Sequence, residues 1–288
     1  MAALDEMLHT SLSVLDHGFV RVVDYMGDDA AVVQAARVSY GRGTQKGSED
    51  RDLIRYLMRH WHTTPFEMCE IKLHVKLPIF VARQWIRHRT ANVNEYSARY
   101  SILDREFYIP ERDQVAPQSE FNKQGRSAAS SADVADAVRA LLRDDSDRAY
   151  SNYLWMLNDK NGSEHDPERP GVARELARIG LGLNTYTQWY WKVDLHNLLR
   201  FLRLRADSHA QYEIRAYADV ILDIVKHWVP LCHEAFMEYQ LGAFSLSASS
   251  LHLVRRALAG EDVDYEGSGL SRREWDELDA VLGLTSRT

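Results

Sequence analysis

Residues 71–77 alternate strictly between apolar and polar side chains, and this pattern constrains the fold more than any other in the chain. The apolar members are Ile71, Leu73, Val75 and Leu77. Because successive side chains of a strand point to opposite faces, the alternation predicts a strand with one buried face. Residues 19–26 and 185–193 crowd β-branched and aromatic side chains together, so they are predicted to be further strands.

Helical spacing and capping signals account for much of the remaining chain. Predicted helices cover residues 29–37, 52–60, 79–88, 132–157 with a break near 144–147, 172–179 and 194–205. Ser208 with Gln211, and Ser271 with Glu274, have the spacing of a capping box, which predicts a helix start at each. These elements predict an α+β (mixed α/β) fold with a central, mostly antiparallel sheet flanked by helices.

The length of 288 residues suits one enzyme-sized unit. We expect a single domain over residues 1–288, with a core at about 15–240 and a helical C-terminal extension at 241–288. The net charge of −7 argues against general nucleic-acid binding. No run approaches the roughly 18 apolar residues that a membrane helix needs. The two distant cysteines and an N-terminus without a signal-peptide pattern predict a cytoplasmic protein that does not bind membranes.

Arginine is concentrated in two segments that are far apart in the sequence. Residues 83–105 carry five arginines around His88, Asn94 and Glu95, and residues 203–215 carry three more. Guanidinium groups suit phosphates and planar carbonyl edges. Two such clusters therefore indicate a pocket for more than one anionic group, such as a dinucleotide and a mononucleotide. The alternative is a set of ordinary surface ion pairs, each worth about 0.3–0.5 kcal/mol.

These residues carry a family pattern. Arg87-His88-Arg89 is followed after seven residues by Ser97, and this spacing resembles the signature of flavin-dependent thymidylate synthases. The resemblance extends over about residues 15–230. Its other blocks are Ala36–Ser39, His62–Glu67, Asn94–Tyr100, Ala177–Ile179, Tyr186-Thr187, Trp191, Leu204–Gln211 and Glu213-Ile214.

The resemblance implies a reaction in which dUMP accepts a methylene group from 5,10-methylenetetrahydrofolate and a hydride from reduced FAD. NADPH would re-reduce the non-covalently bound FAD. The family also implies a homotetramer with active sites at subunit interfaces. No metal is expected.

Individual positions inherit expected roles from the same resemblance. The expected catalytic residue is Arg205, which would bind the uracil edge and stabilise negative charge as it develops. The positions expected to contact the cofactor are Ser39, Thr64, Glu67, Arg87, His88, Arg89, Glu95, Asp194, His196, Arg200 and His209. The positions expected to contact dUMP are Gln84, Trp85, Ile86, Arg87, Glu95, Tyr96, Ser97, Ala98, Arg99, Arg178 and Arg205.

The sequence departs from the family pattern at Asn92, Gly182, Asp194 and Arg200. The family often has neutral polar residues at the last two positions, and an aspartate can only accept hydrogen bonds. The expected reaction needs no enzyme nucleophile, and neither cysteine lies in a matched block. Ser97 has no neighbour in sequence that would activate it, so it is interpreted as a dUMP contact.

Three other interpretations remain open from the sequence. His60, His62 and His74 with Glu67 and Glu70 could bind a metal, although no H-E-x-x-H arrangement is present. The aromatic run at 186–191 could stack on RNA, although a buried strand explains it better. A cysteine-dependent thymidylate synthase would use Cys69 or Cys232 and bind no flavin.

Overall fold

The computed structural model describes residues 4–38, 50–119, 125–162 and 165–283. Its contacts divide the chain into two compact units, Met1–Leu241 and Gly242–Thr288. The boundary falls where the C-terminal extension is predicted to begin, while the assignment of the whole chain to a single domain stays a prediction. No helix of the described residues is long and apolar enough to cross a membrane.

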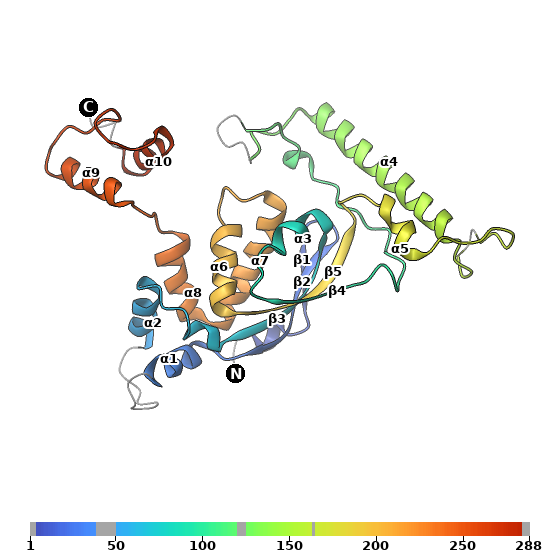
Figure 1. Ribbon diagram of the computed structural model, residues 1–288, viewed down its shortest axis with the longest axis horizontal. Coiled ribbons are helices and arrows are strands. Elements are labelled where there is room, and N and C mark those ends of the chain that lie inside the picture. The colour runs from blue at the N-terminus through green and yellow to red at the C-terminus, as the bar shows by residue number, and fades with distance from the viewer. Residues whose placement is uncertain (1–3, 39–49, 120–124, 163–164, 284–288) are drawn as a thin grey trace. The chain divides into compact units, whose positions relative to one another are not determined.

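A five-stranded sheet forms the centre of the first unit (Figure 1). Its strands are β1 (Ser11–Val14), β2 (Gly18–Met26), β3 (Glu70–Pro78), β4 (Asn92–Glu95) and β5 (Tyr186–Asp194), in the spatial order β1-β2-β3-β5-β4. All four pairings are antiparallel. In the longest register, Leu73 lies opposite Trp191 and Glu70 opposite Asp194. The predicted antiparallel sheet is therefore confirmed.

One face of the sheet is buried against helices. Ile71, Leu73, Val75 and Leu77 are at most 1% exposed, while the lysines and the histidine between them are only partly buried. Helices α3 (Ile79–Trp85), α6 (Leu195–Arg205) and α7 (Tyr212–Trp228) pack on that face (Figure 1). The alternation in the sequence thus reports burial correctly.

Smaller helices complete the first unit. They are α1 (Asp29–Val38), α2 (Asp50–Arg59), α5 (Arg174–Ala177) and α8 (Pro230–Phe236). The Asp29 carboxylate accepts hydrogen bonds from the backbone N–H groups of Leu231 and Cys232, both at 2.9 Å. A residue of α1 therefore caps the start of α8, at a distance in sequence that no local pattern reveals.

The long helix α4 (Ala132–Leu157) corrects one prediction. It runs without a break through residues 144–147, where the acidic run predicted an interruption. Ser146 is 6% exposed, and its hydroxyl donates to the carbonyl of Leu142, so the segment is held inside the helix. The C-terminal half of α4 packs Tyr150, Tyr153 and Leu157 against Ala177 in a small core of its own.

Two helix boundaries also differ from the predictions. The predicted capping box at Ser208 does not form, because α7 begins at Tyr212 with Gln211 as its cap and the Ser208 hydroxyl instead faces the His209 ring. Helix α3 ends at Trp85 rather than near His88. Residues 86–91 consequently form a connection between α3 and β4.

The second unit contains α9 (Ala248–Leu258) and α10 (Arg272–Leu282). Leu253, Trp275 and Leu278 form its core, each at most 3% exposed. The capping box predicted from Ser271 and Glu274 is present, since each side chain accepts a hydrogen bond from the other residue's backbone N–H. The helical C-terminal extension is therefore confirmed.

Candidate active site

A cavity of about 390 Å³, which we call the arginine cavity, lies where the α3–β4 connection meets β5 and α6. Its lining consists of Arg87, His88, Arg89, Thr90, Trp191, Val193, Asn197, Arg200, Leu204 and Arg205. The two arginine-rich segments of the sequence thus meet in one place. Four guanidinium groups around one cavity provide donors for phosphates and carbonyl oxygens, which fits a dinucleotide cofactor.

His88 and Arg205 form the polar centre of the arginine cavity. The Arg205 Nε–H donates to His88 Nε2 at 3.1 Å. Burial, followed by the charges of Arg205 and Arg200, lowers the pKa of His88 from 6.5 to about 4. The ring is therefore neutral at pH 7, with its proton on Nδ1, and can accept this hydrogen bond. The Phe201 ring meets the imidazole edge-on at 5.0 Å and fixes its plane.

The Arg205 side chain is partly buried beside a second cation. Burial, followed by the Arg87 guanidinium, lowers the pKa of Arg205. An arginine remains protonated under such a shift, so its positive charge is held in a position that favours an anion. Arg203, two residues earlier on α6, points elsewhere and lies 5.1 Å over the Trp61 ring. The two arginines therefore point in different directions, and of the two only Arg205 lines the arginine cavity among the residues that the structure describes.

A second cavity, of about 310 Å³, contains most of the other expected substrate contacts. We call it the Glu95 cavity. It is lined by Ile79, Glu95, Tyr96, Ser97, Ala98, Leu103, Arg178, Leu181 and Thr187. No residue lines both cavities in the described part of the chain. The expected site residues therefore fall into two separate groups within one subunit.

The Glu95 cavity has its polar groups fixed by short local contacts. Thr187 donates its hydroxyl to Glu95 Oε1 at 2.8 Å. The Arg99 backbone N–H donates to the Ser97 hydroxyl at 3.3 Å. The Arg178 guanidinium has no hydrogen-bond or ion-pair partner among the described residues, although Arg178 lines the cavity. A free guanidinium beside a turn that presents hydroxyl and backbone groups suits a phosphate.

Several expected site residues line neither cavity among the residues that the structure describes. They are Thr64, Glu67, Gln84, Trp85, Ile86, Arg99, Asp194, His196 and His209. Ser39 lies outside the described residues. Trp85 is fully buried and stacks on Phe201 at 4.7 Å, so its side chain belongs to the core. The roles of these residues toward ligands stay predictions.

Asp194 caps the start of α6 through its carboxylate. One carboxylate oxygen accepts the backbone N–H of Asn197 at 2.8 Å, and the other accepts the Asn197 side-chain amide at 2.8 Å. His209 is held by Asp207, which accepts from both its backbone and its ring at 2.8 Å. Gln84 donates to Gln211, whose amide donates in turn to the buried Glu213.

Asn197 lines the arginine cavity but was missed by the sequence reasoning. The signal was present, because an asparagine three residues after a helix-capping aspartate can reach back to it. Thr187 and Trp191 lie in matched blocks, but no ligand role was given to them. The same holds for Leu204, whereas the apolar residue Ile79 carried no signal that separates it from core positions.

The cysteines do not have the properties of a nucleophile. Cys69 and Cys232 are fully buried and unpaired. Burial raises the pKa of the Cys69 thiol from 9.0 to about 12, with Asp28 and Asp29 contributing. Burial likewise raises the pKa of Cys232 well above its ordinary value. A thiolate is therefore inaccessible at pH 7, which disfavours the cysteine-dependent mechanism.

The metal interpretation has no geometric support in the described ranges. No group of three or more histidine, cysteine or acidic side chains there is arranged to hold an ion. His74 is bound on the sheet, between the Arg21 guanidinium at 2.5 Å and Gln188 at 3.0 Å.

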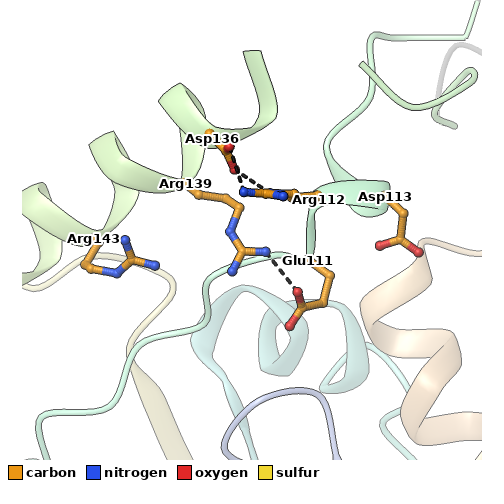
Figure 2. A pocket seen from close by; sticks show the side chains of 6 residues that line it. All are labelled: Glu111, Arg112, Asp113, Asp136, Arg139 and Arg143. Carbon is orange, nitrogen blue, oxygen red and sulfur yellow. Dashed lines mark hydrogen bonds and ion pairs between the residues drawn. The ribbon is translucent and has the colours of Figure 1, made fainter. Parts of the chain in front are cut away.

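A third hollow, of about 780 Å³, lies between α4 and the segment at 111–113 (Figure 2). Its lining is entirely charged: Glu111, Arg112, Asp113, Asp136, Arg139 and Arg143. Arg112 pairs with Asp136 and Arg139 with Glu111, as the dashed lines in Figure 2 mark. Because acid and base balance here, this hollow lacks the cationic excess of the arginine cavity.

The α+β unit holds a cationic cavity and a separate cavity lined by hydroxyl groups. These two cavities are typical of a class of proteins that bind anionic, nucleotide-like ligands. The family model described as "Thymidylate synthase complementing protein" matches residues 21–231. The chain belongs to this family, that of the flavin-dependent thymidylate synthases.

Individual relatives cover nearly the whole chain. A flavin-dependent thymidylate synthase of Gluconobacter oxydans is 67% identical over 98% of this chain and 90% of its own length. One of Rickettsia bellii is 58% identical over 97% of this chain and 96% of its own. Among solved structures, the UMP/dUMP methylase PolB of Streptomyces cacaoi, bound with 5-Br dUMP, superposes with a TM-score of 0.69 at 32% identity. It covers 80% of this chain and 99% of its own.

Proposed function

We propose that the chain is a flavin-dependent thymidylate synthase that converts dUMP to dTMP. Its carbon donor is 5,10-methylenetetrahydrofolate, and its hydride source is FAD reduced by NADPH. The family assignment and the named relatives support the flavin and the thymidylate product. The dUMP analogue bound to the structural neighbour supports dUMP as the substrate.

The observation that carries the proposal is the pair formed by Arg205 and neutral His88 in the arginine cavity. A neutral histidine holds the guanidinium in place without cancelling its charge. Such a fixed cation, placed beside a uracil ring, stabilises the negative charge that develops when the ring is activated. Because no residue needs to attack the ring, the buried cysteines are no obstacle.

The donor-rich lining of the arginine cavity fits FAD. Arg87, His88, Arg89 and Arg200 would hold its phosphates and ring oxygens. When bound, FAD supplies the hydride that completes the methyl group. The protein's own residues bind the cofactor, orient it and exclude water, while NADPH and the folate act as co-substrates.

The Glu95 cavity would hold dUMP. Arg178 and the Ser97–Arg99 turn would contact the phosphate, and Glu95, fixed by Thr187, would accept from a sugar hydroxyl. Arg99 belongs to this set, although its guanidinium faces Glu175 at 3.6 Å in the free chain.

The separation of the two cavities supports a homotetramer with active sites at subunit interfaces. Hydride transfer requires the flavin and the uracil ring to touch, whereas no residue lines both cavities in the described ranges. Juxtaposing the arginine cavity of one subunit with the Glu95 cavity of another would satisfy this requirement. We place the protein in the cytoplasm, acting on free nucleotides.

The first experiment is a visible absorption spectrum of the purified protein with and without dUMP. We expect flavin bands that shift when dUMP is added, because both ligands share one site. NADPH-dependent formation of dTMP would follow. A protein that takes up no FAD on reconstitution would overturn the proposal. The alternative functions would then be the next to test.

A further inference from the structure

Asn197 is a side chain of the arginine cavity whose orientation is imposed from outside that cavity. It lies in the first turn of α6 and lines the cavity beside Arg200 and Val193. Asp194, which precedes the helix, does not line it. The Asn197 side-chain amide nitrogen donates to Asp194 Oδ2 at 2.8 Å, and its backbone N–H donates to Oδ1 at 2.8 Å.

The charge of Asp194 decides which end of the Asn197 amide faces the ligand. An ionised carboxylate can only accept hydrogen bonds, so the –NH₂ end of the amide must turn toward it. The carbonyl oxygen is then directed away from Asp194. This oxygen accepts no hydrogen bond from any residue in the described part of the chain.

We infer that Asn197 is a cofactor-binding residue whose carbonyl oxygen accepts a hydrogen bond from an N–H or O–H group of the flavin nucleotide, and that Asp194 is the positioning residue that holds it in this orientation. The other polar side chains of the cavity are mostly cationic donors. Asn197 adds an acceptor to this set and so recognises a part of the ligand that arginine cannot. The inference rests on the proposed flavin dependence and replaces a direct role for Asp194.

Asp194→Asn is the decisive variant because it preserves size and helix capping while reversing the orientation. Asparagine caps a helix as well as aspartate does. Its carbonyl oxygen would keep the backbone bond to Asn197, which leaves its –NH₂ group facing the Asn197 side chain. That side chain must then turn its oxygen toward position 194 and its –NH₂ group toward the cavity, where the ligand also presents a donor.

The test is a titration of the full-length apoprotein with FAD, followed by absorbance and flavin fluorescence, together with thermal melting of the apoprotein. We expect Asp194→Asn and Asn197→Ala each to weaken FAD binding about tenfold, equivalent to about 1.4 kcal/mol. The melting temperature of apo Asp194→Asn should stay within a few degrees of wild type. His252→Gln, on an exposed residue of the second unit, is the control and should change neither.

A double variant separates positioning from direct contact. If Asp194 acts through Asn197, adding Asp194→Asn to Asn197→Ala should cause no further loss of FAD affinity. A further tenfold loss would mean that Asp194 touches the flavin itself and would overturn the inference, as would unchanged affinity in both single variants. Failure of the wild-type protein to bind FAD would instead overturn the proposed function.

Discussion

The Arg205 guanidinium donates to the imidazole of His88 across 3.1 Å, joining residues that are 117 positions apart in the sequence. The two side chains come from α6 and from the connection after α3. Burial, together with the charge of Arg205, keeps the histidine neutral, and the neutral histidine holds the arginine in place.

Replacing Arg205 with alanine should abolish most turnover while FAD stays bound. The fixed positive charge is expected to act on the uracil ring, and losing one such group costs about 10²–10³ in kcat. The measurements are dTMP formation, dUMP affinity and flavin content. Arg203→Ala is the matched control, because that side chain lies over Trp61 and should leave turnover within about twofold. Normal turnover of Arg205→Ala would refute the assigned role.

The stability of the protein should fall on acidification partly through His88. Because the pKa of His88 is lowered from 6.5 to about 4 in the folded chain, the unfolded chain binds more protons in this interval. The contribution is present above pH 6.5 and is lost as the pH falls toward 4. We expect His88→Gln, which keeps an acceptor for Arg205, to flatten this pH dependence.

Between pH 7 and about pH 4, the free energy of unfolding of the wild type should fall by on the order of 1–2 kcal/mol more than that of His88→Gln. This figure is discounted because the ring is only half buried. Denaturant unfolding at several pH values measures it. His252→Gln, on an exposed histidine, should follow the wild-type curve. Parallel curves for wild type and His88→Gln would contradict the buried neutral state of His88.

Removing Arg178 should weaken dUMP binding without affecting FAD. Its guanidinium lines the Glu95 cavity and has no partner among the described residues, so a phosphate would be its counter-ion. We expect Arg178→Ala to raise the KM for dUMP at least tenfold and to reduce its salt dependence. Arg143→Ala, in the charge-lined hollow of Figure 2, should leave both unchanged. An unchanged KM for Arg178→Ala would remove this residue from the site.

Neither cysteine should be required for activity. Cys69→Ala and Cys232→Ala each remove a buried thiol whose pKa is raised far above neutrality. Each variant should lose on the order of 1 kcal/mol of unfolding free energy through lost packing. Turnover per folded molecule should stay within about twofold. Complete inactivation of a folded variant would favour the cysteine-dependent mechanism.

Of the substitutions considered, replacement of Glu213 should lower the free energy of unfolding most. Its side chain is 2% exposed and accepts from Arg126 at 2.5 Å, Gln211 at 2.8 Å and Tyr108 at 3.0 Å. Glu213→Gln leaves the Arg126 charge without its partner, which should cost about 2–3 kcal/mol. Glu277→Gln, in an exposed pair with Arg273, should cost under about 1 kcal/mol. Chemical denaturation distinguishes the two outcomes.

Much of the fold was predictable because its signals are local. The alternation at 71–77, the β-branched runs and the capping pair at Ser271 depend only on neighbouring residues, and the structure bears them out. The predicted break in α4 and the capping box at Ser208 were wrong because burial and tertiary contacts override local propensity.

The sequence by itself determined three of the five strands, most of the helices and the identity of the family, since periodicity and motif spacing are written along the chain. The short strands β1 and β4 were not predicted. Tertiary structure alone decided which arginines share a cavity and that the Trp85 side chain lies in the core. Those outcomes depend on how α6 packs on β5 and beside the α3–β4 connection. A side chain's direction is fixed by such packing, which no local pattern encodes.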